Sequence, residues 1–342
     1  MRILSLLAAL ALIFSLANTV AAQRVFHVDP KHPELKELDM YGDPYSELLE
    51  DRQPFFSDSK LFSPKTPPSL QIDHDYPKLD GAEGLVPIYA AAANVIYRRS
   101  ADQVGKKPDP RALAVSLGGS TPYAYKALLD GHADMIFALA PSEDLKKEAA
   151  DKGLTYTLTP IAREAFVFLV NENNPVKSLS TEQLRDIYSG KINDWKKVGG
   201  KSGKIMAFQR PKNSGSQTAM LRDVMHDTPM RKPLEAERPA SMGGLLRTVA
   251  DYRNYGNAIG YSFRYYATTM NSNIPNLRLL SVNGIAPTVE NIRNGSYPFT
   301  EDFYIITVRP LSENAAKLRD WFANDEGQQF IEDAGFVSLK GR

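Results

Sequence analysis

An arginine, two serines and a glycine lie close together in FQRPKNSGSQTAML, residues 208–221. Arg210 ends a short apolar run, IMAF, that is typical of a strand. Ser214, Gly215 and Ser216 then begin a helical pattern. The first N–H groups of a helix have no partner within it, and the helix dipole adds partial positive charge there. With a glycine for close approach and an arginine fork for two oxygens, the segment predicts a small-anion site. An ordinary helix cap beside a surface arginine is the alternative.

Two other expected helix starts carry similar residues. In GGSTPYAYKALLDG, Ser120 or Thr121 is the expected N-cap, and a proline follows in the first turn. In DGAEGLVPIYAAAANVIY, Glu83 and Gly84 precede such a proline. If the three helix starts converge, backbone and hydroxyl donors would surround one anion. If they do not converge, they are three ordinary caps.

The elements that would position these residues alternate from Gly81 onward. Helical patterns, including one long helix ENAAKLRDWFANDEGQQFIEDAG, are separated by strand-like runs such as ALAVSL, ADMIFAL, AFVFLV, AIGYSF and FYIITV. Glycines in DKG, YSG and DAG are expected at helix C-termini, and Ser180 with Gln183 forms a capping box. Alternation of this kind predicts an α/β fold with largely parallel sheets, whose ligands bind beyond the carboxyl ends of the strands.

The N-terminus, residues 1–22, is typical of an export signal. It has Arg2, a long apolar run and a Val20-x-Ala22 cleavage pattern, although a retained membrane anchor is the alternative. The chain has no cysteine to carry a disulfide or a lipid anchor, so we expect a soluble protein that diffuses freely in a periplasm. Residues 23–78 form an expected Pro-rich arm, to which we assign no chemistry.

Other classes of function find little support in the 342 residues. The net charge is +1 and there is no basic stripe, which argues against a nucleic-acid partner. His27, His32 and His74 lie in the arm without a compact ligand set, so we expect no metal and no cofactor. We find no nucleophile–base pair and no G-x-S-x-G motif, so we expect no enzyme activity.

Several blocks of the sequence together resemble a known family. TPIAREAFVFLVNENNPVKSLSTEQLRDIYSGKINDWKKVGG, QRPKNSGSQT, NAIGYSFRYY and LLSVNGIAPTVENIRNGSYPFTEDFYIIT are similar to phosphate-binding proteins, the periplasmic receptors of phosphate ABC transporters. The resemblance runs from about Leu79 to Phe336. It implies a type II periplasmic-binding-protein fold: two α/β lobes with mixed sheets flanked by helices, and a ligand cleft between them. Lobe 1 would hold residues 79–164 and 262–342, and lobe 2 residues 165–261.

The resemblance also implies a ligand and its contacts. The family's arginine followed by Ser-Gly-Thr falls on Arg210, Ser214, Gly215 and Ser216, with one hydroxyl exchanged for another. The hydroxyl of the second helix start falls on Ser120 or Thr121, of which we favour Thr121. The implied function is capture of a small oxyanion, inorganic phosphate above all, by a monomer that delivers it to a membrane permease.

Two departures from the family concern carboxylates. The family offers threonine or serine where this chain has Glu83, and its aspartate after the strand ADMIFAL is missing, since no carboxylate follows before Glu143. Glu83 could supply the missing acceptor, and would then distinguish HPO₄²⁻ from sulfate. It could instead repel anions, so that the ligand is not phosphate. It could also point to solvent or favour the helix N-terminus.

Some features are weaker guides to function. For the glycine-rich helix start at Met242–Gly244 we favour close packing over a place in the cleft, and we expect Tyr265 and Tyr266 to serve packing. Two other functions stay open: a sensor or scaffold lobe that binds another solute or a partner protein, motivated by the arm and Glu83, and a secreted phosphoester hydrolase that uses the anion site.

Overall fold

The structure is a computed structural model that describes Leu49 and residues 52–98, 110–117, 120–233, 239, 241–250 and 256–340. The chain divides into Met1–Gly42 and Asp43–Arg342, and the described elements all belong to the second unit. The expected export signal, the first part of the arm, His27 and His32 lie outside the described residues.

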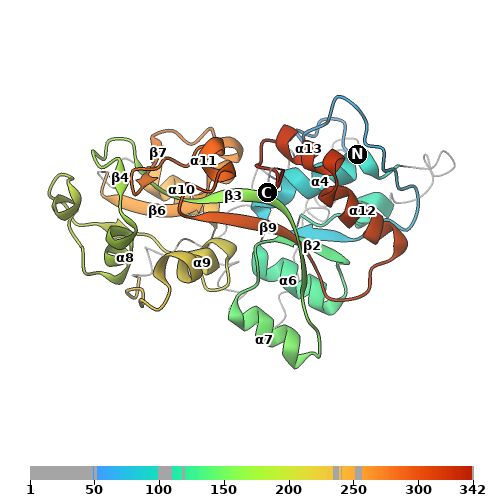
Figure 1. Ribbon diagram of the computed structural model, residues 1–342, viewed down its shortest axis with the longest axis horizontal. Helices are drawn as coiled ribbons and strands as arrows, with labels where there is room; N and C mark the ends of the chain where they lie inside the picture. Colours follow the sequence, from blue (N-terminus) through green and yellow to red (C-terminus); the bar gives the residue numbers. More distant parts are fainter. Residues whose placement is uncertain are drawn as a thin grey trace, which may run out of the picture. The chain divides into compact units, whose positions relative to one another are not determined.

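Within the described residues, seven strands form one sheet in the order β1-β2-β9-β3-β6-β5, with β7 paired to β3 (Figure 1). Their bounds are β1 Leu79–Gly81, β2 Met135–Ala138, β3 Thr157–Asn171, β5 Met206–Ala207, β6 Ala258–Phe263, β7 Leu277–Leu279 and β9 Thr300–Thr307. A separate ladder joins β4, Ser178–Leu179, to β8, Ser281–Val282.

The sheet is mixed, so the expectation of largely parallel sheets was wrong and the mixed sheets implied by the resemblance are confirmed. The ladders β1–β2, β5–β6 and β4–β8 are parallel. The long strand β3 pairs antiparallel with β9, β6 and β7, and β2 pairs antiparallel with β9. Strands β6, β7 and β9 all follow β3 in the chain and run in the direction opposite to it.

The long strand β3 connects two groups of elements. Its first part, Thr157–Ala165, pairs with β9, and its second part, Phe166–Val170, pairs with β6. Near β2 and β9 lie α4 Val86–Ile96, α6 Thr121–Asp130, α7 Glu143–Asp151, α12 Glu313–Ala323 and α13 Asp325–Asp333 (Figure 1). Near β6 lie α8 Thr181–Ser189, α9 Gly215–Ala219, α10 Met242–Ala250 and α11 Val289–Arg293 (Figure 1). The short α5 spans Pro110–Leu113.

Strands β7 and β8 follow β6 in the chain but stay with the second group. β7 pairs with Leu169–Asn171 of β3, and β8 pairs with β4. The expected first lobe includes residues 262–342, so chain position alone would assign these strands to it. The final passage back to the first group is made by β9, which begins at Thr300.

Local signals set several helix ends. The capping box of α8 is confirmed, since Gln183 N donates to Ser180 Oγ at 3.0 Å and Ser180 N donates to Gln183 Oε1 at 2.8 Å. The long C-terminal helix is split, because Asn324 accepts a hydrogen bond from Gly327 N and begins α13. The expected strand ALAVSL is wrong: α5 ends within it, and Val115 makes a single bridge to Leu79.

The described part of the arm, residues 52–78, lies against the body. Leu61 and Ile72 are buried in the main apolar core, and Ile72 forms a bridge with Tyr97. Ser69 donates through N and Oγ to the carboxylate of Glu326 on α13. No helix in the described ranges is long and apolar enough to cross a membrane.

Candidate functional site

The expected binding residues lie together around one cavity. Its volume is about 60 Å³, which is room for a few water molecules or one small ion. The expected residues that line it are Glu83, Gly84, Ser120, Thr121, Arg210, Ser214, Gly215 and Ser216. They come from three helix starts and one strand end, which are far apart in the chain and are brought together by the fold.

The starts of α6 and α9 face each other across the cavity. A Cβ atom added to Gly215 would lie 3.1 Å from Thr121 Oγ1 and 3.1 Å from Leu139 Cδ1, which is tighter than most real contacts. Glycine at the first position of α9 therefore allows the close approach of the two helix starts. At Gly84, an added Cβ would lie 3.6 Å from Tyr266 Cδ2, which is an ordinary contact distance.

Hydroxyl groups at the cavity have different roles. Ser214 caps α9, and its Oγ accepts a hydrogen bond from Gln217 N at 3.3 Å. Ser120 and Ser216 carry buried Oγ atoms that have no hydrogen-bond partner among the described residues. Because buried polar atoms are nearly always satisfied in native proteins, these two hydroxyls call for a polar partner in the cavity, either water or a ligand.

The backbone of Arg210 is held rigidly where β5 leads into α9. Its N–H donates to Gln217 Oε1 at 3.0 Å and to the hydroxyl of Tyr261 at 2.9 Å. The residue is 8% exposed and lines the cavity. A nearly buried guanidinium beside the hydroxyls gives the cavity the positive charge and the planar donors that an oxyanion requires.

Glu83 lies at the same cavity, in a short 3₁₀ turn, Glu83–Leu85, before α4. The hydroxyl of Tyr266 donates to Glu83 Oε1 at 2.8 Å. Burial raises the pKa of Tyr266 well above its usual range, and the Glu83 carboxylate adds to the rise, so the tyrosine remains a donor. The half-buried carboxylate thus lies at the cavity and is held by a tyrosine that also lines it.

The segment directly after β2, where the resemblance implies an aspartate, contributes no carboxylate to the cavity. Leu139, which follows β2, lines the cavity, and Glu143 is the first residue of α7. Its side chain is 88% exposed and pairs with Lys146. Among the residues at the cavity, Glu83 and Glu164 are the carboxylates.

Sequence reasoning missed a second set of cavity residues. Tyr265 and Tyr266, expected to serve packing, both line the cavity, as does Met242, for which a place in the cleft was the less favoured interpretation. The set is completed by Ala82, Leu85, Leu139, Glu164, Phe263, Phe303 and Phe336. One signal was readable: Tyr265 and Tyr266 follow the end of β6, where ligands of α/β sheets bind.

A metal ion needs a cluster of ligating side chains. In the described part of the chain, no group of three or more His, Cys, Asp or Glu could hold one. His74 contacts Asp73 and is largely exposed in the arm.

Comparison with known proteins gives consistent results. A sequence profile of the PBP superfamily domain matches residues 92–330. The phosphate-binding protein PstS of Staphylococcus saprophyticus is 29% identical over 243 residues, which cover 68% of this chain and 73% of that protein.

Solved structures are similar in fold. One, from Clostridium perfringens, is described as a phosphate ABC transporter substrate-binding protein with bound phosphate. It has a TM-score of 0.58 and 24% identity, over 77% of this chain and 99% of that chain. An ABC-type phosphate transport receptor from Vibrio cholerae has a TM-score of 0.53 and 19% identity, over 76% of this chain and 98% of that chain. These likenesses confirm the expected fold. Since the profile match spans well over half of the sequence, this chain belongs to the PBP superfamily.

Proposed function

We propose that this protein is a non-catalytic receptor that captures inorganic phosphate in a periplasm and delivers it to the permease of an ABC transporter. The observation that carries the proposal is a cavity at which a nearly buried arginine meets two buried hydroxyls that have no hydrogen-bond partner among the described residues. The names of the relatives point to the same ligand. No cofactor is needed for this function.

Each cavity residue takes a specific role in this proposal. Arg210 supplies charge and a planar fork for two phosphate oxygens. Ser120, Thr121 and Ser216 donate from their hydroxyls, and the N–H groups at the starts of α6 and α9 add backbone donors. Ser214 shapes the start of α9 through its cap. Exclusion of water around the ion strengthens every one of these bonds.

Glu83 is the proposed acceptor for the phosphate proton. At neutral pH part of the ligand is HPO₄²⁻, which carries one P–OH donor, whereas sulfate carries none. The carboxylate already accepts from Tyr266 through Oε1 and can accept a further hydrogen bond. A donor-free anion at the same place would offer the carboxylate no proton and would be repelled by its charge, which disfavours sulfate.

We place the ligand between two lobes that close on it. Two contacts join the start of α7, in the first lobe, to the loop before α9, in the second: Lys212 Nζ is 2.6 Å from Asp144 Oδ2, and Ser142 Oγ is 3.0 Å from Asn213 Oδ1. We propose the expected lobes with one change: residues 79–164 and most of 262–342 form the first lobe, and residues 165–261 belong to the second. The stretch that carries β7, β8 and α11 is counted with the second lobe because of its pairing.

Titration calorimetry tests the proposal on protein that has been unfolded and refolded to remove carried-over ligand. We expect tight phosphate binding and no sulfate binding. Glu83→Gln should reduce the preference for phosphate over sulfate by at least about tenfold, because an amide NH₂ can donate to sulfate.

The matched control is Glu143→Gln, which changes an exposed carboxylate and should leave both affinities unchanged. An unchanged preference in Glu83→Gln would remove Glu83 from the site. Absence of phosphate binding by the wild-type protein would overturn the proposed function itself.

A further inference from the structure

A buried carboxylate, Glu164, lies beside the cavity without an assigned role in anion binding. Its side chain has 0% exposure, and it lies on β3 where that strand changes partner. Ala165 still pairs with β9, whereas Phe166 pairs with β6. Glu164 is therefore located at the passage between the two groups of elements.

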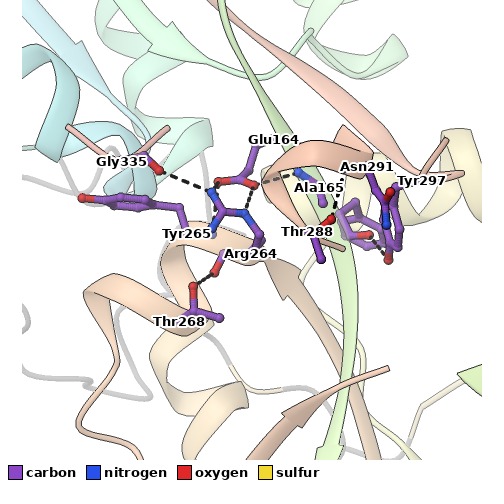
Figure 2. Close-up of polar contacts among 10 residues, drawn as sticks. Glu164, Ala165, Arg264, Tyr265, Thr268, Thr288, Asn291, Tyr297 and Gly335 are labelled. Carbon is purple, nitrogen blue, oxygen red and sulfur yellow. Dashed lines mark hydrogen bonds and ion pairs between the residues drawn. The ribbon is translucent and has the colours of Figure 1, made fainter. Parts of the chain in front are cut away.

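Both carboxylate oxygens of Glu164 are fully engaged (Figure 2). Oε1 accepts from Ala165 N at 2.9 Å and from Arg264 Nε at 3.0 Å. Oε2 accepts from Tyr265 N at 3.1 Å and from Arg264 Nη2 at 3.5 Å. Burial raises the pKa of Glu164, while Arg264 and the two backbone N–H groups oppose that rise.

The ion pair joins three segments of the chain. Arg264 directly follows β6, Glu164 belongs to β3, and Arg264 Nη2 also donates to Gly335 O, beyond α13, at 3.3 Å (Figure 2). A buried ion pair contributes little net stability, because desolvation offsets most of the attraction. Its specific geometry fixes the relative positions of these three segments.

Residues on both sides of Arg264 line the cavity: Phe263 before it, and Tyr265 and Tyr266 after it. The ring of Tyr265 stacks on Phe336 with centroids 3.8 Å apart, and both side chains line the cavity. The next residue, Tyr266, holds Glu83 through its 2.8 Å hydrogen bond. The backbone that Glu164 fixes at Tyr265 N thus leads directly to the tyrosine that orients Glu83.

We propose that Glu164 is a positioning residue of the anion site, which acts through Arg264 and Tyr265 to hold Tyr266 against Glu83. This inference rests on the proposed function, because it concerns the same cavity and its phosphate. In this proposal Glu164 affects the choice of anion through its neighbours, because both of its carboxylate oxygens are already used by Arg264 and by backbone N–H groups.

A double-mutant cycle measured by calorimetry tests this inference. The variants are Glu164→Gln, Tyr266→Phe and the two combined, titrated with phosphate and with sulfate. We expect each single variant to bind phosphate about tenfold more weakly and to lose part of its preference over sulfate. The double variant should bind no more weakly than the weaker single variant, because both changes release the same carboxylate.

The matched control is Asp302→Asn. It changes the neighbouring ion pair, Arg163 Nε to Asp302 Oδ1 at 3.0 Å, which joins β3 to β9 instead of β3 to the end of β6, and neither residue lines the cavity. We expect unchanged phosphate affinity. If Glu164→Gln fails to fold because Arg264 is left unpaired, the charge-neutral double variant Glu164→Gln/Arg264→Gln takes its place with the same expected loss.

Three results would overturn the inference while the proposed function stands. Glu164→Gln could bind phosphate as tightly as the wild-type protein, or the double variant could lose affinity by the product of the two single losses. Asp302→Asn could also lose as much affinity as Glu164→Gln. Wild-type protein that binds no phosphate would refute the proposed function, and this inference with it.

Discussion

At the scale of single residues, two serines two positions apart should respond differently to loss of their hydroxyls. Ser216 Oγ is buried without a partner among the described residues, so Ser216→Ala leaves no protein group unsatisfied. We expect unchanged or slightly higher stability. Phosphate affinity should fall roughly 10- to 100-fold, because a hydrogen bond to a charged ligand contributes about 1.5–3 kcal/mol.

Ser214→Ala is the matched comparison. It removes the cap that accepts from Gln217 N and should lower the free energy of unfolding by about 1 kcal/mol. Thermal unfolding without ligand and calorimetry with phosphate measure the two quantities. Equal losses of stability in the two variants would contradict the assignment of Ser216 to the ligand and Ser214 to the helix.

The sequence was a good guide to residues whose role follows from a local pattern. Arg210 and Ser214–Ser216 lie where a strand meets a helix, and that arrangement is readable within a few positions. The contact between Glu83 and Tyr266 joins residues 183 positions apart, and Glu164 meets Tyr265 across 101 positions. Such contacts depend on how the strands associate, which local periodicity does not specify.

At the scale of elements, a cluster of ionisable side chains fastens the helical segment that begins at Gly215 to β9. Arg222, in the π-helical turns that continue α9, contacts Asp223 at 2.7 Å and also Glu301 on β9. Burial raises the pKa of Glu301 to about 8, the Asp223 carboxylate adds to the rise, and Arg222 opposes it. The segment that carries Ser216 is therefore held by a group that titrates near physiological pH.

The sign of the resulting pH dependence follows from the raised pKa. Between about pH 4.5, the ordinary value for glutamate, and pH 8, the folded protein holds a proton on Glu301 that the unfolded chain has released. Stability therefore falls as pH rises through this window. We expect the melting temperature to fall more steeply from pH 6 to pH 9 in the wild-type protein than in Glu301→Gln.

The difference should reach a few degrees, because about 1 kcal/mol corresponds to roughly 2–4 °C for a domain of this size class. Glu143→Gln, which alters an exposed glutamate, should follow the wild-type curve. Parallel curves for the wild-type protein and Glu301→Gln would show that Glu301 does not bind a proton in this range.

The elements themselves were predicted unevenly, for a physical reason. Helices with strong caps, such as α8, were found with their ends, because the signals lie within a few residues. Strand partners were not found, since parallel and antiparallel pairing of a buried strand give the same apolar run. The run ALAVSL illustrates the ambiguity, because a short apolar run fits a buried helix end as well as a strand.

At the scale of the whole molecule, the site depends on segments from most of the chain. The cavity takes residues from Ala82 near the start of the body to Phe336 near its end. The arm adds to the same body, since Leu61 and Ile72 are buried in its core. Binding should therefore stabilise the entire body rather than one local segment.

Phosphate should raise the melting temperature in proportion to the logarithm of its concentration. A ligand that binds the folded state alone adds RT ln(1 + [L]/Kd), about 2.7 kcal/mol at 100 times Kd, which corresponds to roughly 5–10 °C here. We expect a single transition that moves as one, measured by circular dichroism on refolded, ligand-free protein. Sulfate at the same ionic strength should cause no such shift, and Arg210→Gln should lose most of the response to phosphate. A phosphate-dependent shift that persists in Arg210→Gln would place the bound ion elsewhere on the protein, and a transition that splits into two would show that the ligand holds one lobe without the other.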